Sequence, residues 1–138
     1  MTVIRRLGKL LLLPLLMGVG LVSSPPKTQV RRIGMVIRIK PENIADYKRM
    51  HADSNPGVRD LLEQANMRNF SIFLRRFDDG QYYLFGYYEY VGDNYEEDMA
   101  KLAANPRNQK WLSVCNPMQI PLQGEKTWAF MEEVFHNR

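Results

Sequence analysis

The stretch YKRMH at residues 47–51 places a phenol and an imidazole four residues apart. If this stretch is helical, Tyr47 and His51 project from one face about one turn apart and can address the same small ligand. Histidine gives and takes protons near neutral pH because its ordinary pKa is ~6.5, so the pair is typical of an acid–base site. The same spacing also occurs where both side chains pack into a core.

Few other residues carry groups suited to chemistry. Cys115 is the only cysteine, which excludes an intrachain disulfide and a cysteine-based zinc cluster, and a buried, inert thiol is expected. The other histidine, His136, lies near the C-terminus and is expected to be exposed. Since no phosphate-binding glycine loop, Ser-His-Asp set or cluster of metal ligands is found in the sequence, no cofactor and no metal is expected.

The N-terminus has the pattern of a secretory signal. Residues 1–9 are basic and contain no acid, residues 10–22 are mostly apolar, and small residues and prolines follow. The apolar run is shorter than the ~20 residues that a membrane-spanning helix needs. We expect a signal peptide over residues 1–24, with an uncleaved membrane anchor as the alternative, a linker over 25–31, and export to the periplasm or the cell exterior.

The chain that follows this leader is electrically balanced. Four of the 19 basic residues precede residue 30, which leaves 15 basic residues against 15 acidic ones. The sequence pI of 9.3 therefore reflects the leader. A balanced domain without a basic patch excludes nucleic acid as an expected partner, and a membrane is expected to contact only an uncleaved N-terminal segment.

Hydrophobic periodicity predicts the order βαββαβ over residues 32–138, which we expect to form one domain. The predicted strands cover residues 33–40, 69–77, 82–90 and 126–135, and the predicted helical pieces cover residues 44–51, 58–65, 95–103 and 106–115. Asp93 is the expected N-cap of the third helical piece and Asn105 that of the fourth. Residues 118–125 are expected to be a loop.

The predicted final strand turns every second side chain to one face. On this alternation Glu132 faces inward and is expected to form an ion pair with Arg38 or Lys40, because a buried carboxylate needs a partner. Gly86, in the third predicted strand, either lets a ligand or a backbone approach closely or makes room for a bulky neighbour.

The predicted order is that of a ferredoxin-like α+β fold, with an antiparallel sheet and the helices on one of its faces. The strands are rich in aromatic residues, so the other face also needs a cover. A second copy of the sheet would provide one, and we expect a homodimer in which two sheets form a dimeric α+β barrel.

Five stretches in this order resemble the L-rhamnose mutarotase family: YKRMH, NFSIFL, LFGYYEY, AANPRNQKW followed by NPMQIPL, and MEEVFH. The resemblance runs from about residue 32 to residue 137. It implies a dimeric α+β barrel, an isomerase that interconverts the α and β anomers of L-rhamnose without a metal. It also implies that His51 is the proton donor and that a monosaccharide is bound by four residues: Tyr47, Phe70, Trp111 and Leu112.

Three positions depart from the family pattern. Phe70 stands where the family usually has a tyrosine, Leu112 where it has a second tryptophan, and residues 55–57 read Asn-Pro-Gly instead of Trp-Pro-Glu. All three concern how the sugar is held. Two alternatives therefore stay open: a non-catalytic sugar-binding relative, and a small α+β barrel protein of the monooxygenase kind with a hydrophobic ligand.

Overall fold

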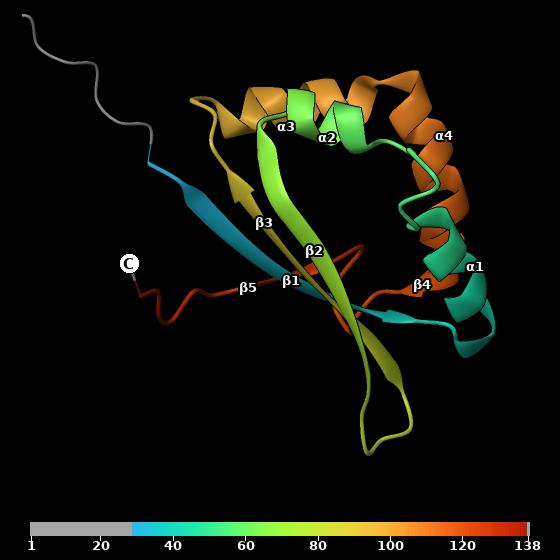
Figure 1. Cartoon of the computed structure of the whole chain (residues 1–138). Helices are drawn as coiled ribbons and strands as arrows, with labels where there is room; N and C mark the ends of the chain where they lie inside the picture. Colours follow the sequence, from blue (N-terminus) through green and yellow to red (C-terminus); the bar gives the residue numbers. More distant parts are fainter. Residues whose placement is uncertain (1–28, 138) are drawn as a thin grey trace, which may run out of the picture.

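The computed structural model describes residues 29–137, and the predicted leader over residues 1–24 lies outside this range, as do residues 25–28 of the predicted linker. The described elements follow the predicted order, with short additions (Figure 1). They are β1 (Arg31–Ile39), η1 (Pro41–Asn43), α1 (Ile44–Met50), α2 (Arg59–Gln64), β2 (Met67–Arg76), β3 (Tyr82–Tyr90), α3 (Tyr95–Ala104), α4 (Pro106–Cys115), η2 (Asn116–Met118), β4 (Gln119–Ile120) and β5 (Ala129–Met131).

The strands form one antiparallel sheet in the order β2-β3-β1-β4, with β5 also paired to β1. β1 runs against β3 along its whole length, from Arg31 opposite Tyr90 to Ile39 opposite Tyr82. The helices all lie on one face of this sheet (Figure 1). The expected ferredoxin-like α+β architecture is therefore confirmed.

The core lies between the sheet and the helices. Alternate residues of β1 are buried, as a strand with one covered face requires. One cluster joins β1 to the ends of β2 and β3 near α3, and its buried members are Ile33, Met35, Ala65, Met67, Tyr88 and Tyr90. The second cluster anchors α1 to the sheet and contains Ile37, Ile39, Tyr47 and Leu84. Tyr47 is thus held in place by the core beneath it.

Capping residues decide where the second pair of helices begins. The Asn105 side chain accepts hydrogen bonds from the backbone N–H groups of Arg107 and Asn108, which confirms the predicted cap of α4. The predicted cap of α3 at Asp93 is wrong by one residue. The cap is Asn94, whose side-chain oxygen accepts from the backbone N–H of Glu97, the third residue of the helix. The side-chain NH₂ of Asn94 also donates to the carboxylate of Glu97 at 3.0 Å.

The predicted final strand over residues 126–135 is also wrong in its extent. Two short strands share the free edge of β1: β4 pairs with residues 38–39 and β5 with residues 34–36. β4 falls in the segment that we expected to be a loop. After β5 the chain leaves the sheet, and Val134 and Phe135 are 88% and 79% exposed.

Glu132 does not face inward in the structure. It is exposed, as is His136, and its neighbour Glu133 forms the ion pair, accepting from Arg32 Nε at 2.8 Å. The alternation of a strand does not extend to residue 132 because β5 ends at Met131. The expected pairing of Glu132 with Arg38 or Lys40 is therefore wrong.

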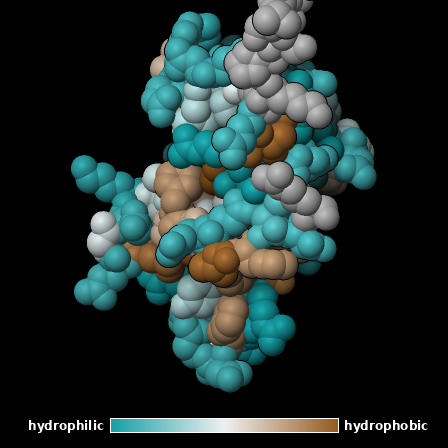
Figure 2. All heavy atoms as spheres, turned by 90° about the vertical axis from the view of Figure 1, so that its left-hand side faces the viewer, coloured by the Kyte–Doolittle hydropathy of each residue, from teal (hydrophilic) through white to brown (hydrophobic). Residues whose placement is uncertain are grey.

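The sheet face away from the helices carries aromatic side chains. Val36, Phe85 and Phe73 are cross-strand neighbours, and Phe73 is 63% exposed. Figure 2 shows apolar atoms gathered between hydrophilic ones on the side of the molecule that faces left in Figure 1. A single chain therefore leaves apolar side chains of its sheet in contact with solvent.

Candidate active site

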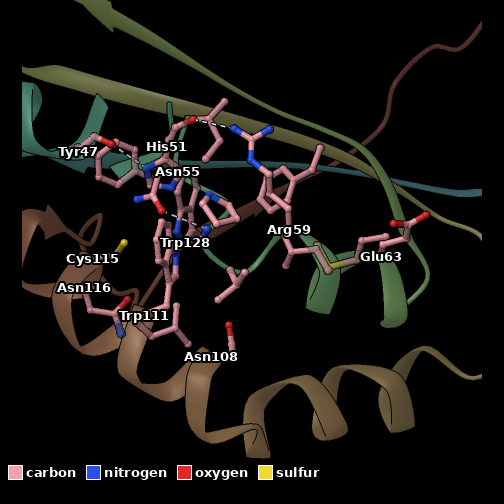
Figure 3. A pocket seen from close by; sticks show the side chains of 18 of the residues that line it. Tyr47, His51, Asn55, Arg59, Glu63, Asn108, Trp111, Cys115, Asn116 and Trp128 are labelled. Carbon is pink, nitrogen blue, oxygen red and sulfur yellow. Dashed lines mark hydrogen bonds between the residues drawn. The ribbon is translucent and has the colours of Figure 1, made fainter. Parts of the chain in front are cut away.

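A cavity of about 520 Å³ lies between the sheet, α4 and the segment that joins α1 to α2 (Figure 3). All the residues that the sequence predicted to act on a ligand line this one cavity, namely Tyr47, His51, Phe70, Trp111 and Leu112. They come from three segments that are far apart in the sequence. Folding thus brings every predicted site residue together.

His51 lies one residue after the end of α1, as its C-cap, and not inside the helix as its spacing suggested. Its Nδ1 is 2.8 Å from the backbone carbonyl oxygen of Tyr47. A carbonyl oxygen only accepts hydrogen bonds, so Nδ1 must carry the proton. In the neutral ring the lone pair is then on Nε2, which has no hydrogen-bond partner among residues 29–137.

Two aromatic rings hold the imidazole from different sides. The Tyr47 ring stacks on it with centroids 4.1 Å apart and an angle of 25° between the planes. The Trp111 ring meets it edge-on, at 5.2 Å and 72°. With the Nδ1 hydrogen bond, these contacts fix the ring plane of His51 and leave it little rotational freedom.

Burial lowers the pKa of His51 below its ordinary value, because the charged imidazolium loses water contacts. The hydrogen bond to the Tyr47 carbonyl raises this pKa in part, and the nearby positive charge of Arg59 lowers it again. The net direction is downward. At pH 7 the ring is therefore neutral and Nε2 is a base.

Tyr47 is a buried phenol. Its oxygen accepts a hydrogen bond from Gln119 Nε2 at 3.4 Å, and burial raises its pKa well above the ordinary value. The hydroxyl therefore stays protonated at physiological pH. The ring and the backbone carbonyl of Tyr47 orient the imidazole, while its hydroxyl lies toward Gln119.

The turn after His51 is shaped around Trp111. Asn55 donates to the carbonyl of Met50 at 3.0 Å and accepts from the backbone N–H of Gly57 at 3.2 Å. Gly57 has a φ of +53°, and a Cβ at this position would lie 2.9 Å from the six-membered ring of Trp111. Only glycine meets both conditions without strain. The Asn-Pro-Gly sequence therefore lets the indole pack directly against the turn.

Arg59 ties this turn to the histidine. It donates to the backbone carbonyl of His51 at 2.9 Å and to Asp53 at 3.1 Å. The guanidinium is about half exposed, so its ion pair with the solvent-exposed Asp53 adds little stability. Its hydrogen bond to the His51 carbonyl instead fixes the backbone just after the imidazole.

Phe70 and Leu112 complete the apolar part of the lining. Phe70 is half-buried and packs on Tyr88, with ring centroids 5.3 Å apart. Leu112 is 38% exposed, one residue after Trp111 in α4. Neither side chain can form a hydrogen bond with a ligand, so the polar contacts must come from other residues.

The cavity is also lined by residues that the sequence did not indicate as site residues. Asn108 and Cys115 lie three residues before and four residues after Trp111 in α4, so helical spacing could have found them. Asn108 is 5% exposed and donates to the carbonyl of Leu102, and Cys115 is buried, as expected, which raises its pKa to about 11. Gln119, in β4, and Trp128, just before β5, follow α4 in the C-terminal part of the chain, where the sequence predicted a loop and a strand but no site residue.

No group of three or more His, Cys, Asp or Glu residues within residues 29–137 is arranged to hold a metal ion. In the same range, no helix is long and apolar enough to cross a membrane.

Comparison with known proteins gives a consistent result. A family model described as L-rhamnose mutarotase matches residues 32–137. The L-rhamnose mutarotase of Mannheimia succiniciproducens is 31% identical over 103 residues, which cover 75% of this chain and 78% of that protein. Among solved structures, an L-rhamnose mutarotase from Formosa agariphila is similar in fold, with a TM-score of 0.58 and 22% identity over 78% of this chain and 99% of that chain.

The fold and the cavity define a ferredoxin-like α+β protein in which one neutral histidine faces a cavity large enough for a small ligand. The family match covers most of the chain, and the Mannheimia relative is similar over three quarters of it. The chain belongs to the L-rhamnose mutarotase family.

The state of His51 can be measured directly. In a His136→Gln variant, which leaves one histidine, we expect the imidazole to titrate below the ordinary pKa of 6.5, since burial opposes its charge. The unfolded chain then binds more protons than the folded one just below pH 6.5, so the free energy of unfolding falls as the pH decreases through this value. Proton NMR of the ring signals gives the pKa, and titration at or above 6.5 would contradict the burial argument.

Proposed function

We propose that this protein is an L-rhamnose mutarotase, an isomerase that interconverts the α and β anomers of L-rhamnose or a related deoxysugar. The observation that carries the proposal is the hydrogen bond from His51 Nδ1 to the Tyr47 carbonyl, which leaves Nε2 as the free base in the cavity. The family match supports the substrate class.

Mutarotation moves one proton and breaks one ring bond. Nε2 of His51 takes the proton of the anomeric hydroxyl as the bond between the anomeric carbon and the ring oxygen breaks, and the imidazolium returns this proton to the ring oxygen. The open aldehyde turns about its bond to C2, and the same steps in reverse close the ring on its other face. Protons and electrons balance within the sugar and one histidine, so neither a metal nor a redox partner takes part.

The other predicted site residues are proposed to bind the sugar. Trp111 provides a flat apolar surface for the C–H face of the ring. Tyr47 orients the histidine, and Phe70 and Leu112 contribute apolar contacts where a tyrosine and a tryptophan would offer more. No observation favours either of the two alternatives, a non-catalytic sugar-binding relative and a monooxygenase-like protein.

A homodimer is proposed as the working form. The row of Val36, Phe85 and Phe73 lies on the sheet face that has no helices, with Phe73 63% exposed, and Met131 of the edge strand β5 is 43% exposed on the same face, opposite Gly34. Apolar patches on a sheet face are typical of association surfaces. A second copy of the same face would cover them by symmetric contact.

Export is proposed from residues 1–24, whose basic start and apolar run have the pattern of a signal peptide. An exported mutarotase would act on sugar released outside the cytoplasm and present both anomers to an uptake system.

Replacing the imidazole tests the catalytic proposal. We expect His51→Ala to reduce the rate of anomer exchange by about 100-fold or more, because a positioned acid–base group typically contributes 10²–10⁴-fold. The exchange rate is measured by magnetisation-transfer NMR on L-rhamnose, with His136→Ala, an exposed histidine outside the cavity, as the control. The wild-type rate should also decrease as the pH falls through the pKa of His51, which lies below 6.5, since protonated Nε2 has no lone pair.

Exchange at the buffer rate with the sugar still bound would instead favour the non-catalytic relative. Oxygen consumption with an aromatic substrate, without anomer exchange, would favour the monooxygenase alternative.

Light scattering after size exclusion tests the dimer. We expect the wild type to elute at twice the mass of one chain and Phe73→Glu to elute at one, because a carboxylate in this apolar face cannot be desolvated without a partner. Val114→Glu is the matched control, since Val114 is similarly apolar and 46% exposed but lies on α4, in the helix layer. A wild type with the mass of one chain at micromolar concentration would refute the dimer.

Fusing residues 1–31 to a reporter that is active only outside the cytoplasm tests export. We expect reporter activity, and its loss when Leu11 and Leu13 are replaced by Arg, because charges in the apolar run prevent membrane insertion. The N-terminal sequence of the mature protein then separates a cleaved signal from an anchor. A reporter without activity would overturn the proposal.

A further inference from the structure

Trp128 lies in the cavity, although the sequence indicated only that it shares one face of the predicted final strand with Glu132. It is the last residue of the irregular segment 121–128 and immediately precedes β5. The indole is half-buried, packs against both core clusters and lines the cavity together with His51 and Trp111 (Figure 3). A second indole thus reaches the site from the C-terminal part of the chain.

The indole rests on the sheet at Gly86. A Cβ at Gly86 would lie 3.4 Å from Cζ3 of Trp128 and only 2.7 Å from Cε of Met35. The absence of a side chain at this residue of β3 therefore makes room for Met35 and leaves Trp128 in ordinary van der Waals contact, which favours the bulky-neighbour interpretation of this glycine. Ile72 is paired with Gly86 across the strands and also lines the cavity, so Trp128 and Ile72 form an apolar floor.

The polar edge of Trp128 is not used by the protein. Its Nε1–H has no hydrogen-bond partner among residues 29–137, and it is not among the buried polar atoms that lack one. The N–H is therefore accessible. A half-buried indole with a free N–H is suited to a ligand that has an apolar face and hydroxyl groups at its rim, as a pyranose has.

We propose that Trp128 is a substrate-contacting residue that determines affinity for the sugar, by stacking against its C–H face or methyl group and donating from Nε1–H to a hydroxyl. This inference rests on the proposed mutarotase function. It explains how a cavity with Leu112 in α4, which offers no ring to stack on, still presents two indoles to a sugar. The second indole comes from the segment before β5 instead of from α4.

Fluorine NMR on the wild-type chain labelled with 5-fluorotryptophan tests the contact directly. The chain has two tryptophans, so two signals are expected, and Trp111→Phe and Trp128→Phe assign them. On titration with L-rhamnose we expect both signals to shift along one saturation curve. A shift of the Trp111 signal without any shift of the Trp128 signal overturns the inference and leaves the proposed function standing. If neither signal shifts, the sugar does not occupy the cavity and both proposals fail.

Kinetics of a conservative variant separate contact from a structural role. Trp128→Phe keeps an aromatic ring on Gly86 but removes the N–H and part of the stacking area. We expect KM for L-rhamnose to rise about 3- to 10-fold with kcat within twofold, since one lost hydrogen bond or ring contact has an effect of this size. Val114→Ala, outside the cavity on α4, should change neither constant. An unchanged KM in a Trp128→Phe protein with wild-type circular dichroism overturns the inference.

Discussion

The hydrogen bond between His51 Nδ1 and the carbonyl of Tyr47 is the interaction on which the site depends. The same carbonyl also accepts a hydrogen bond from the backbone N–H of His51 at 3.1 Å, so the imidazole uses its second lone pair and the helix keeps its own hydrogen bond. The Nδ1 hydrogen bond also determines the tautomer, and hence which ring nitrogen acts as a base. Burial keeps the imidazole neutral at rest, while the carbonyl dipole favours the imidazolium once a proton arrives. These opposed effects are suited to a group that must both take and return a proton.

The sheet supports this arrangement from below. Tyr47 is part of the cluster formed by Ile37, Ile39 and Leu84, so the residue that supplies both the carbonyl and the stacking ring cannot move without disturbing the core. Because Tyr47 is closely packed against the rigid sheet, the His51 ring that stacks on it also has a fixed orientation. The position of the imidazole is thus as well determined as the position of a buried strand.

Two glycines shape the lining beside the two indoles. Gly57 removes a side chain next to Trp111, so the indole lies directly against the turn that follows His51. Gly86, in the sheet, makes room for Met35, and its Cβ position lies 3.4 Å from the Trp128 ring, at van der Waals contact. In both places the missing Cβ lets an indole lie close to the backbone, and the lining is formed by few, large apolar surfaces with polar groups at their edges. This distribution suits a ring that is apolar on one face and hydroxylated at its rim.

Local patterns in the sequence were sufficient for the elements whose causes are local. Runs of β-branched, apolar and aromatic residues bounded by a proline or a turn predicted β1, β2 and β3, and the Asn105-Pro106 pair predicted the start of α4. The spacing of Tyr47 and His51 predicted a shared face. Each of these depends on residues within a few positions of one another, and the resemblance of five short stretches then placed Phe70, Trp111 and Leu112 beside them.

Only the tertiary structure decided the C-terminal part. Whether residues after 118 pair with β1 depends on the free edge of a strand some eighty residues earlier, which admits β4 and β5 as two separate pieces. For the same reason Glu133 and not Glu132 meets Arg32, and Trp128 enters the cavity. The sequence by itself therefore determined the first three strands, the helices and the shared face of Tyr47 and His51, since these follow from neighbouring residues. The strand edge, the ion pair and the second indole depend on contacts between distant segments, which no local pattern records.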